Sequence, residues 1–249
     1  MHPIRVAVAG AKGRMGQEVV KMLGTDEQLV YVGPIDTRKS DQEIGEQFAE
    51  LKPDVLVDFT TPHDVYRNMD LSIQHGVRPV VGTTGLSTEQ LQDLTARFKA
   101  AGLGAILAPN FAIGAILCMK FAAMAAKYMP HVEIIELHHD RKLDAPSGTA
   151  LKTAELISQA REHLSQGHPD EKELISGARG SEYDGFRIHS VRLPGMVAHQ
   201  EVLFGAVGQT LSIRHDSINR ESFMPGVNMA IKAVMNLDHL VYGLEHLID

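Results

Sequence analysis

The stretch that decides the fold is residues 4–16, Ile4-Arg5-Val6-Ala7-Val8-Ala9-Gly10-Ala11-Lys12-Gly13-Arg14-Met15-Gly16. A short apolar run ends at Gly10, and a helical pattern has begun by Met15. The glycines follow the spacing G-x-x-G-x-x-G, a variant of the dinucleotide-binding fingerprint. Glycines allow a tight turn and let backbone N–H groups approach a pyrophosphate where a helix begins. The stretch therefore predicts a strand, a phosphate-binding turn and a helix, with Gly10, Lys12, Gly13, Arg14, Met15 and Gly16 contacting a cofactor.

A carboxylate further along the chain strengthens this interpretation. Asp36 lies twenty residues beyond Gly16, at the end of an apolar run, where a carboxylate can bind the adenosine ribose hydroxyls. That contact favours NADH, whereas Arg38 and Lys39 could pair with the 2′-phosphate of NADPH. The residues leave both cofactors open.

Short apolar runs alternate with helical patterns through the first half of the chain. We expect strands at Ile4–Ala9, Leu29–Ile35, Val55–Asp58, Pro79–Gly82 and Ala105–Ala108. We expect helices at Met15–Leu23, Val65–Gln74 and Ser87–Ala101. Several of the strand runs are continuously apolar, as is typical of parallel strands buried on both faces. The alternation predicts βαβ units in an α/β domain with a Rossmann-like, doubly wound parallel sheet.

The alternation of short strands and helices ends after Asn110. Helices are expected at Ile113–Tyr128, Thr149–Glu162 and Pro225–Val241. Extended runs occupy His131–His138, Phe186–Leu193, Val197–Gly205 and Gln209–His215. This half predicts a second, α+β domain with an open sheet that is largely antiparallel or mixed.

Composition excludes several classes of protein. The formal charge of the 249 residues is 24 − 31 = −7 without a basic block, which argues against a nucleic-acid partner. The longest apolar candidate, Phe111–Met129, is interrupted by Lys120 and Lys127, so no membrane span is expected. One cysteine cannot form an internal disulfide, and the N-terminus lacks a signal-peptide pattern, so we expect a cytoplasmic protein. No metal site is predicted, because the spacing of the histidines does not match usual ligand pairs.

Two further loops follow predicted parallel strands, where ligands of such sheets lie. They supply small hydroxyl residues and an amide that could hydrogen-bond a nicotinamide carboxamide. The candidate cofactor contacts in them are Gly82, Thr83, Thr84, Ala108, Asn110 and Phe111.

The densest polar constellation is residues 136–149, Glu-Leu-His-His-Asp-Arg-Lys-Leu-Asp-Ala-Pro-Ser-Gly-Thr. Lys142 is a cation, and His138 and His139 can supply protons near neutral pH. Ser147, Gly148 and Thr149 begin the next helix, where free N–H groups and hydroxyls form an anion site. The set predicts a pocket for a carboxylate-bearing substrate whose reaction needs a proton.

The pattern E-x-H-H-x-x-K-x-D-A-P-S-G-T-A at residues 136–150 closely resembles the signature of the dihydrodipicolinate reductase family. The resemblance extends over Gly10–Gly16, Asp58–Thr60, Gly82–Gly85, Pro109–Gly114 and Asn219–Arg220, and thus over nearly the whole chain. It implies reduction of a cyclic imine dicarboxylate, made from pyruvate and aspartate semialdehyde, to tetrahydrodipicolinate with NADH or NADPH, in lysine and diaminopimelate biosynthesis.

The resemblance also implies roles for residues. His138 corresponds to the proton donor, and Lys142 to the cation that helps polarise the conjugated imine. His139, Ser147, Gly148, Thr149 and, less directly, Arg220 would hold the substrate carboxylates. The implied domains are 1–109 with 219–249 for the dinucleotide and 110–218 for the substrate, the second providing the open sheet of a homotetramer.

One stretch departs from the family's pattern. The segment Thr37–Pro53 is short, so we expect an adenine-side strand and helix to be trimmed there, which bears on cofactor preference. Two alternatives stay open. A phosphorylating semialdehyde dehydrogenase would need a reactive cysteine, but Cys118 lies in an apolar helical run. A non-catalytic nucleotide sensor would have no use for the His138–Thr149 constellation.

Overall fold

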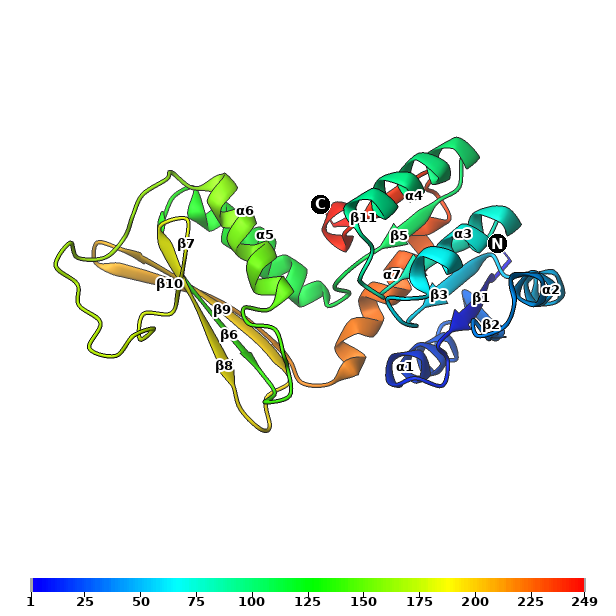
Figure 1. Cartoon of the computed structure of the whole chain (residues 1–249), viewed down its shortest axis with the longest axis horizontal. Coiled ribbons are helices and arrows are strands. Elements are labelled where there is room, and N and C mark those ends of the chain that lie inside the picture. The colour runs from blue at the N-terminus through cyan, green and yellow to red at the C-terminus, as the bar shows by residue number, and fades with distance from the viewer. Residues whose placement is uncertain (1, 249) are drawn as a thin grey trace. The chain divides into compact units, whose positions relative to one another are not determined.

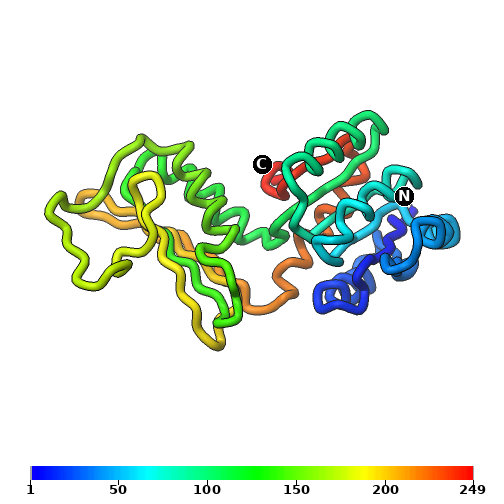
Figure 2. Tube along the Cα trace, in the orientation of Figure 1, coloured from blue at the N-terminus to red at the C-terminus, as the bar shows by residue number. Residues whose placement is uncertain are grey.

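The structure, a computed structural model, describes residues 2–248, and the chain divides into two units (Figure 1). Unit 1 comprises Met1–Ala112 and Arg220–Asp249, and unit 2 comprises Ile113–Asn219. The trace in Figure 2 leaves unit 1 in green and returns to it in orange, so unit 2 is inserted into the chain of unit 1.

Unit 1 contains, within the described residues, a six-stranded parallel sheet in the order β11-β5-β4-β3-β1-β2. The strands are β1 (Ile4–Ala9), β2 (Leu29–Ile35), β3 (Val55–Asp58), β4 (Arg78–Val81), β5 (Ala105–Leu107) and β11 (Leu240–Tyr242). The helices are α1 (Arg14–Leu23), α2 (Asp41–Leu51), α3 (Val65–His75), α4 (Thr88–Ala101) and α7 (Met224–Val234), with 3-10 turns η1 (Arg220–Phe223) and η2 (Leu244–Leu247). Helices cover the central strands on both faces, so Val6–Ala9 and Val55–Val57 are almost completely buried. The predicted doubly wound α/β sheet is confirmed.

Two expectations about unit 1 are wrong. The segment Thr37–Pro53 does contain a helix, because α2 (Asp41–Leu51) occupies most of it. Helix α2 begins with a capping box, in which the Ser40 hydroxyl accepts from the Glu43 N–H and the Glu43 carboxylate accepts from the Ser40 N–H. The last helix ends at Val234 rather than Val241, and the chain then adds β11 to the edge of the sheet beside β5.

Unit 2, all of whose residues the structure describes, is a five-stranded mixed sheet in the order β10-β9-β6-β8-β7. The strands are β6 (His131–His138), β7 (Ser181–Tyr183), β8 (Phe186–Arg192), β9 (Ala198–Ala206) and β10 (Gln209–Ser217). Strands β6 and β8 are parallel, and the other pairs are antiparallel. The predicted α+β unit with a mixed sheet is confirmed.

Helices α5 (Ile113–Ala126) and α6 (Gly148–Ala160) lie side by side on one face of this sheet (Figure 1). Their small residues, such as Ala122 and Ala154, pack against Ile134, Phe186 and Phe204 of the strands. Because side chains alternate along a strand, Ile135, Leu137, Val191 and Leu203 point to the opposite face. The sheet therefore has one face packed against the helices and an opposite face, not covered by them, on which these apolar residues lie among charged ones such as Glu133 and Glu201.

Candidate active site

In unit 1 four adjacent parallel strands have their C-terminal ends at the same edge of the sheet. Backbone bonds join them in a row, from Phe59 N to Ala9 O (3.2 Å), Gly82 N to Asp58 O (2.9 Å) and Ala108 N to Val81 O (2.9 Å). The predicted turns at Gly10, Gly82 and Ala108 therefore follow neighbouring strands β1, β4 and β5, with β3 between β1 and β4. This edge is where ligands of doubly wound sheets bind.

The glycine turn is packed too closely for side chains. Gly10 has φ +76°, and a Cβ there would lie 2.5 Å from the Phe59 carbonyl oxygen. A Cβ on Gly16 would lie 2.2 Å from the Gly10 carbonyl oxygen. Gly13 is the N-cap of α1, and no side chain caps this helix, so its N–H groups face outward for a ligand. The turn has the close backbone approach that a pyrophosphate site needs.

The loop after β3 supports this turn. The ring of Phe59 lies 5.8 Å from that of Phe111, and a Cβ on Gly82 would come within 2.0 Å of it. Asp58, which is completely buried, fixes the loop by accepting from Thr60 N (2.8 Å), Thr60 Oγ1 (2.6 Å) and Asn68 Nδ2 (2.8 Å). Burial raises the pKa of Asp58 despite these hydrogen bonds. Phe59 thus joins three of the predicted loops, a role that the sequence does not reveal.

One strand-end loop of unit 1 carries a buried polar atom without a hydrogen-bond partner in the described chain. The hydroxyl Oγ1 of Thr83 is buried and has no hydrogen-bond partner in the part of the chain that the structure describes. Thr83, Thr84, Pro109 and Tyr242 line a cavity of about 210 Å³. An unsatisfied buried hydroxyl costs free energy unless a ligand completes it, so the loop fits a polar cofactor group.

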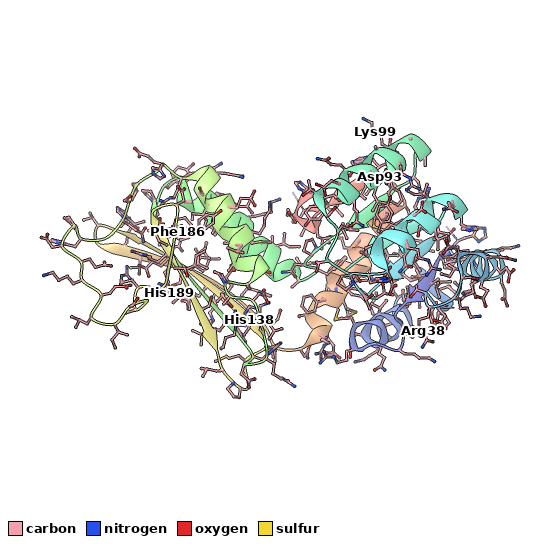
Figure 3. All side chains as sticks on the ribbon, in the orientation of Figure 1. Arg38, Asp93, Lys99, His138, Phe186 and His189 are labelled. Atoms are coloured by element: carbon pink, nitrogen blue, oxygen red, sulfur yellow. The ribbon has the colours of Figure 1, made fainter. Side chains whose placement is uncertain are left out.

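Asp36 and Arg38 already contact each other. Arg38 donates from Nε to Asp36 Oδ1 and from Nη2 to Oδ2, both at 2.8 Å, and its guanidinium is largely exposed (Figure 3). These hydrogen bonds lower the pKa of Asp36 to about 2. The acid that favours a ribose diol and the cation that favours a phosphate therefore form one pair.

The remaining predicted cofactor contacts differ in exposure. Lys12, Arg14 and Thr84 are exposed, whereas Ala108 and Phe111 are buried and belong to the core beneath the site. Met15 and Asn110 are half-buried, and Asn110 Oδ1 accepts from Ala112 N (2.8 Å).

In unit 2 the chemical residues gather where β6 ends. His138 is the last residue of β6 and lies at that end of the sheet (Figure 3). Its Nδ1 contacts Oε2 of Glu136, which is completely buried. Arg192 of β8 donates from Nη2 to Glu136 Oε1 (2.7 Å) and from Nη1 to Oε2 (2.9 Å). Burial would raise the pKa of Glu136, but hydrogen bonds from His138, Arg192 and Ser190 outweigh it and hold that pKa at about 2.

The loop after β6 carries the predicted cation. Lys142 Nζ contacts both carboxylate oxygens of Asp144, at 2.8 and 2.9 Å. Asp144 is exposed, and its side chain belongs to the same loop, so a substrate carboxylate could compete for the ammonium group. Lys142 can therefore exchange the Asp144 carboxylate for a carboxylate of the substrate.

The start of α6 forms the other side of this cluster. The Ser147 hydroxyl caps the helix by accepting from Ala150 N (3.2 Å), and the Ser147 N–H donates to Glu136 Oε1 (3.2 Å). Gly148 is exposed, and a Cβ there would meet nothing within 4 Å. His139 Nδ1 is buried and has no hydrogen-bond partner among residues 2–248. The helix N-terminus, a polar atom without a partner and Lys142 all suit an anionic ligand.

Six of the seven predicted catalytic and substrate-binding residues belong to one unit. His138, His139, Lys142, Ser147, Gly148 and Thr149 lie in unit 2 between the end of β6 and the start of α6. Arg220 is exposed at the start of η1 in unit 1. The sequence analysis missed Arg192, because it is 56 residues from Glu136 and only the parallel pairing of β6 with β8 joins them.

Two other kinds of feature are absent from the described residues. Among residues 2–248, no three His, Cys, Asp or Glu side chains are grouped closely enough to hold a metal ion. Within the same residues, no helix is long and apolar enough to cross a membrane.

Two features define the class of protein. Unit 1 is a doubly wound sheet with a glycine turn, and unit 2 carries a His-Lys cluster beside a helix N-terminus. Together they define a two-domain dinucleotide-binding oxidoreductase. Two family models match the chain, "Dihydrodipicolinate reductase, N-terminus" over residues 4–111 and "Dihydrodipicolinate reductase, C-terminus" over residues 114–248. This chain belongs to the dihydrodipicolinate reductase family.

Individual relatives match over their full length. The chain is 58% identical to the 4-hydroxy-tetrahydrodipicolinate reductase of Halalkalibacterium halodurans, covering 99% of this chain and 100% of the relative. It is 57% identical to the 4-hydroxy-tetrahydrodipicolinate reductase of Shouchella clausii, covering 98% of this chain and 99% of that relative. A dipicolinate-bound dihydrodipicolinate reductase from Paenisporosarcina matches with a TM-score of 0.91 and 50% identity, covering 99% of this chain and 100% of that one. The predicted family and enzyme class are confirmed.

Proposed function

We propose that this chain reduces the cyclic imine dicarboxylate of lysine and diaminopimelate biosynthesis, with His138 as proton donor and Lys142 as substrate-binding cation. The observation that carries these roles is the meeting of His138, Lys142 and the start of α6 at one end of the sheet of unit 2. The relatives are named 4-hydroxy-tetrahydrodipicolinate reductases, and one solved relative is described as dipicolinate-bound. Dipicolinate is a planar dicarboxylate, which supports a site built for two carboxylates.

The residues divide the work of the reaction. When bound, a reduced nicotinamide dinucleotide supplies a hydride to the conjugated imine. The ring then carries an extra electron pair toward its nitrogen, and His138 delivers the proton that balances it, so that the ring gains two hydrogens in total. Lys142 and the N–H groups at the start of α6 hold the carboxylates and stabilise the developing charge.

The dinucleotide binds at the strand ends of unit 1. The backbone N–H groups of Arg14 and Met15 would hold the pyrophosphate, and the Thr83 hydroxyl, which has no partner among residues 2–248, would bond a polar group of the nicotinamide side. The pairing of Asp36 with Arg38 supports use of both NADH and NADPH. With NADH bound, Asp36 would hold the ribose hydroxyls, and with NADPH bound, Arg38 would hold the 2′-phosphate.

The open face of the sheet in unit 2 packs against copies of the same chain. Ile135, Leu137, Val191 and Leu203 form an apolar strip between charged residues of that face, and an apolar centre with a polar rim suits a subunit interface. A homotetramer is the assembly we propose, following the family resemblance.

The alternative with a covalent thiol has no support. Cys118 is buried in α5 with 3% of its surface exposed, and burial raises the pKa of its thiol. Such a thiol is a poor nucleophile.

The test is a coupled assay in which freshly generated imine dicarboxylate is mixed with the protein and reduced nicotinamide, whose absorbance is followed. We expect oxidation of either cofactor to depend on the imine. His138→Ala and Lys142→Ala should lose at least about a hundredfold in turnover, with nucleotide affinity retained. Oxidation at the background rate with both cofactors would overturn the function, and loss of nucleotide affinity alone would overturn the role assignment.

A further inference from the structure

A buried carboxylate in unit 2 has no part in the reaction proposed so far. Glu136 is completely buried, yet it is charged and lies two residues before His138 on the same strand. Burial of a carboxylate is costly unless it is paired and hydrogen-bonded. Its partners come from three separate segments, with His138 on β6, Arg192 on β8 and Ser147 at the start of α6.

We propose that Glu136 and Arg192 are positioning residues for catalysis, which fix the orientation and charge of His138 and tie it to the Lys142 loop. This inference rests on the proposed role of His138 as proton donor. It goes further by assigning two residues that the motif and its roles leave without a purpose.

The first argument is geometric. An imidazole ring has two nitrogens, and Nδ1 of His138 is taken by Glu136 Oε2. The proton on the Nδ1 side is therefore held against the carboxylate, and Nε2 is the nitrogen left to meet a substrate. A carboxylate in this position fixes both the tautomer and the ring orientation of a catalytic histidine.

The second argument is electrostatic. A histidine that delivers a proton passes through the imidazolium form, which a nearby carboxylate stabilises. Arg192 moderates this effect, because its guanidinium neutralises the same carboxylate through Nη1 and Nη2. The loop after β6 adds the titratable His139 and four charged residues, of which Asp140 and Arg141 are exposed and Lys142 and Asp144 pair with each other. A substrate dicarboxylate would add negative charge here and favour protonation of His138.

The third argument concerns the loop. Arg192 Nη2, besides contacting Glu136, donates to the backbone oxygen of Asp144 (2.8 Å). The side chain of Asp144 in turn accepts from Lys142. One guanidinium thus connects the proton donor on β6 with the segment that carries the cation, and so fixes the spacing between the two groups that contact the substrate.

A purely structural ion pair is the competing explanation, and the chain offers a matched control for it. Glu133, on the same strand, contacts Arg179 Nη2 (2.5 Å) and His189 Nε2 (2.7 Å). Glu133 and Glu136 are three residues apart, so they point to opposite faces of the sheet. The two clusters have the same kinds of group, but Glu133 does not contact the candidate site.

The experiment compares Glu136→Gln, Arg192→Lys and Glu133→Gln in the imine-dependent assay over a range of pH. In Glu136→Gln we expect turnover to fall about a hundredfold and KM to change less than about threefold. The basic limb of the turnover profile should move to lower pH, because the protonated ring loses its anionic neighbour. Arg192→Lys, which keeps the charge but loses the two-point contact, should raise KM and lower turnover without moving the limb downward.

Glu133→Gln should leave the position of the basic limb unchanged, with the oligomeric state verified by light scattering. A Glu136→Gln profile that coincides with the wild-type profile, or the same shift in Glu133→Gln, would overturn the positioning role. The role is also tested without altering Glu136, by ¹⁵N spectra of the histidine rings of the wild type, assigned with His138→Gln. Neutral His138 should carry its proton on Nδ1, and a proton on Nε2 would contradict the proposal even if the protein is an active reductase. An inactive wild type would instead overturn the proposed function.

Discussion

Arg38 and Asp36 form a two-point pair at the end of β2, with both N–O distances at 2.8 Å, at the position expected to read the adenosine ribose. The pair is exposed, so its net contribution to stability is small and either partner can turn to a ligand.

The first prediction concerns cofactor choice. Arg38→Ala should raise KM for NADPH about tenfold and change KM for NADH less than threefold, because a phosphate loses a two-point donor. Asp36→Ala should weaken NADH binding and leave NADPH binding intact. Steady-state kinetics with each cofactor measures both, and Lys99→Ala, at an exposed position of α4 outside the predicted contacts, is the control. Equal effects on the two cofactors would show that the pair does not select between them.

The second prediction concerns the stability of unit 2. Arg192→Leu leaves Glu136 buried beside one fewer cation, so the free energy of unfolding should fall by about 3–5 kcal/mol. Urea unfolding followed by circular dichroism measures the change. Arg141→Leu, on the exposed loop nearby, should cost no more than about 0.5 kcal/mol. Equal losses in the two variants would mean that Glu136 is adequately held by its other partners.

The third prediction is a dependence of stability on acid pH. The pKa of Glu136 is about 2 in the folded protein, below the ordinary 4.5, so its contribution is present above pH 4.5 and lost as pH falls toward 2. The contribution amounts to about 3 kcal/mol. Unfolding free energies of wild type and Glu136→Gln should therefore converge between pH 4.5 and 2. A difference that stays constant over this range would contradict the low pKa of Glu136.

The fourth prediction tests the start of α6 as the carboxylate site. A methyl group on Gly148 would touch nothing in the chain, so Gly148→Ala should fold with unchanged or slightly higher stability. The same methyl group would crowd a carboxylate at the helix N-terminus and should raise KM for the imine about tenfold or more. Nucleotide affinity is the internal control. An unchanged KM for the imine would place the carboxylate elsewhere.

The fifth prediction concerns assembly. Leu203→Asp puts a charge into the apolar strip on the open face of unit 2 and should dissociate the proposed homotetramer in sedimentation velocity. Leu174→Asp introduces the same charge on a fully exposed loop and should leave the assembly intact. A tetramer that survives Leu203→Asp would mean that another surface joins the subunits.

Local patterns made much of the fold predictable. The continuous apolar runs of β1, β2 and β3 have the predicted bounds, and the capping box at Ser87 begins α4 as expected. A capping box at Ser40 also begins α2, a helix that the short segment Thr37–Pro53 does not lead one to expect. Strand β11 could not be predicted, because three residues become a strand only by pairing with β5, more than 130 residues earlier.

The candidate site was predictable in a similar way. A continuous motif placed His138, Lys142 and Ser147 together, because they follow one another along the chain. Phe59 and Arg192 depend on pairing between distant strands, and neither residue type indicates a function by itself. Residues that support a site from a neighbouring strand are therefore the part that a single sequence hides.

The late position of β11 has a consequence for biosynthesis. Unit 2 ends at Asn219, so a ribosome completes all of it before α7 and β11 of unit 1 have been synthesised. During this interval β5 is an exposed edge strand that has no neighbour on one side. The nascent chain thus contains the whole of unit 2 while unit 1 is still incomplete. The sheet of unit 1 is completed only when residues 240–242 leave the exit tunnel and pair with β5.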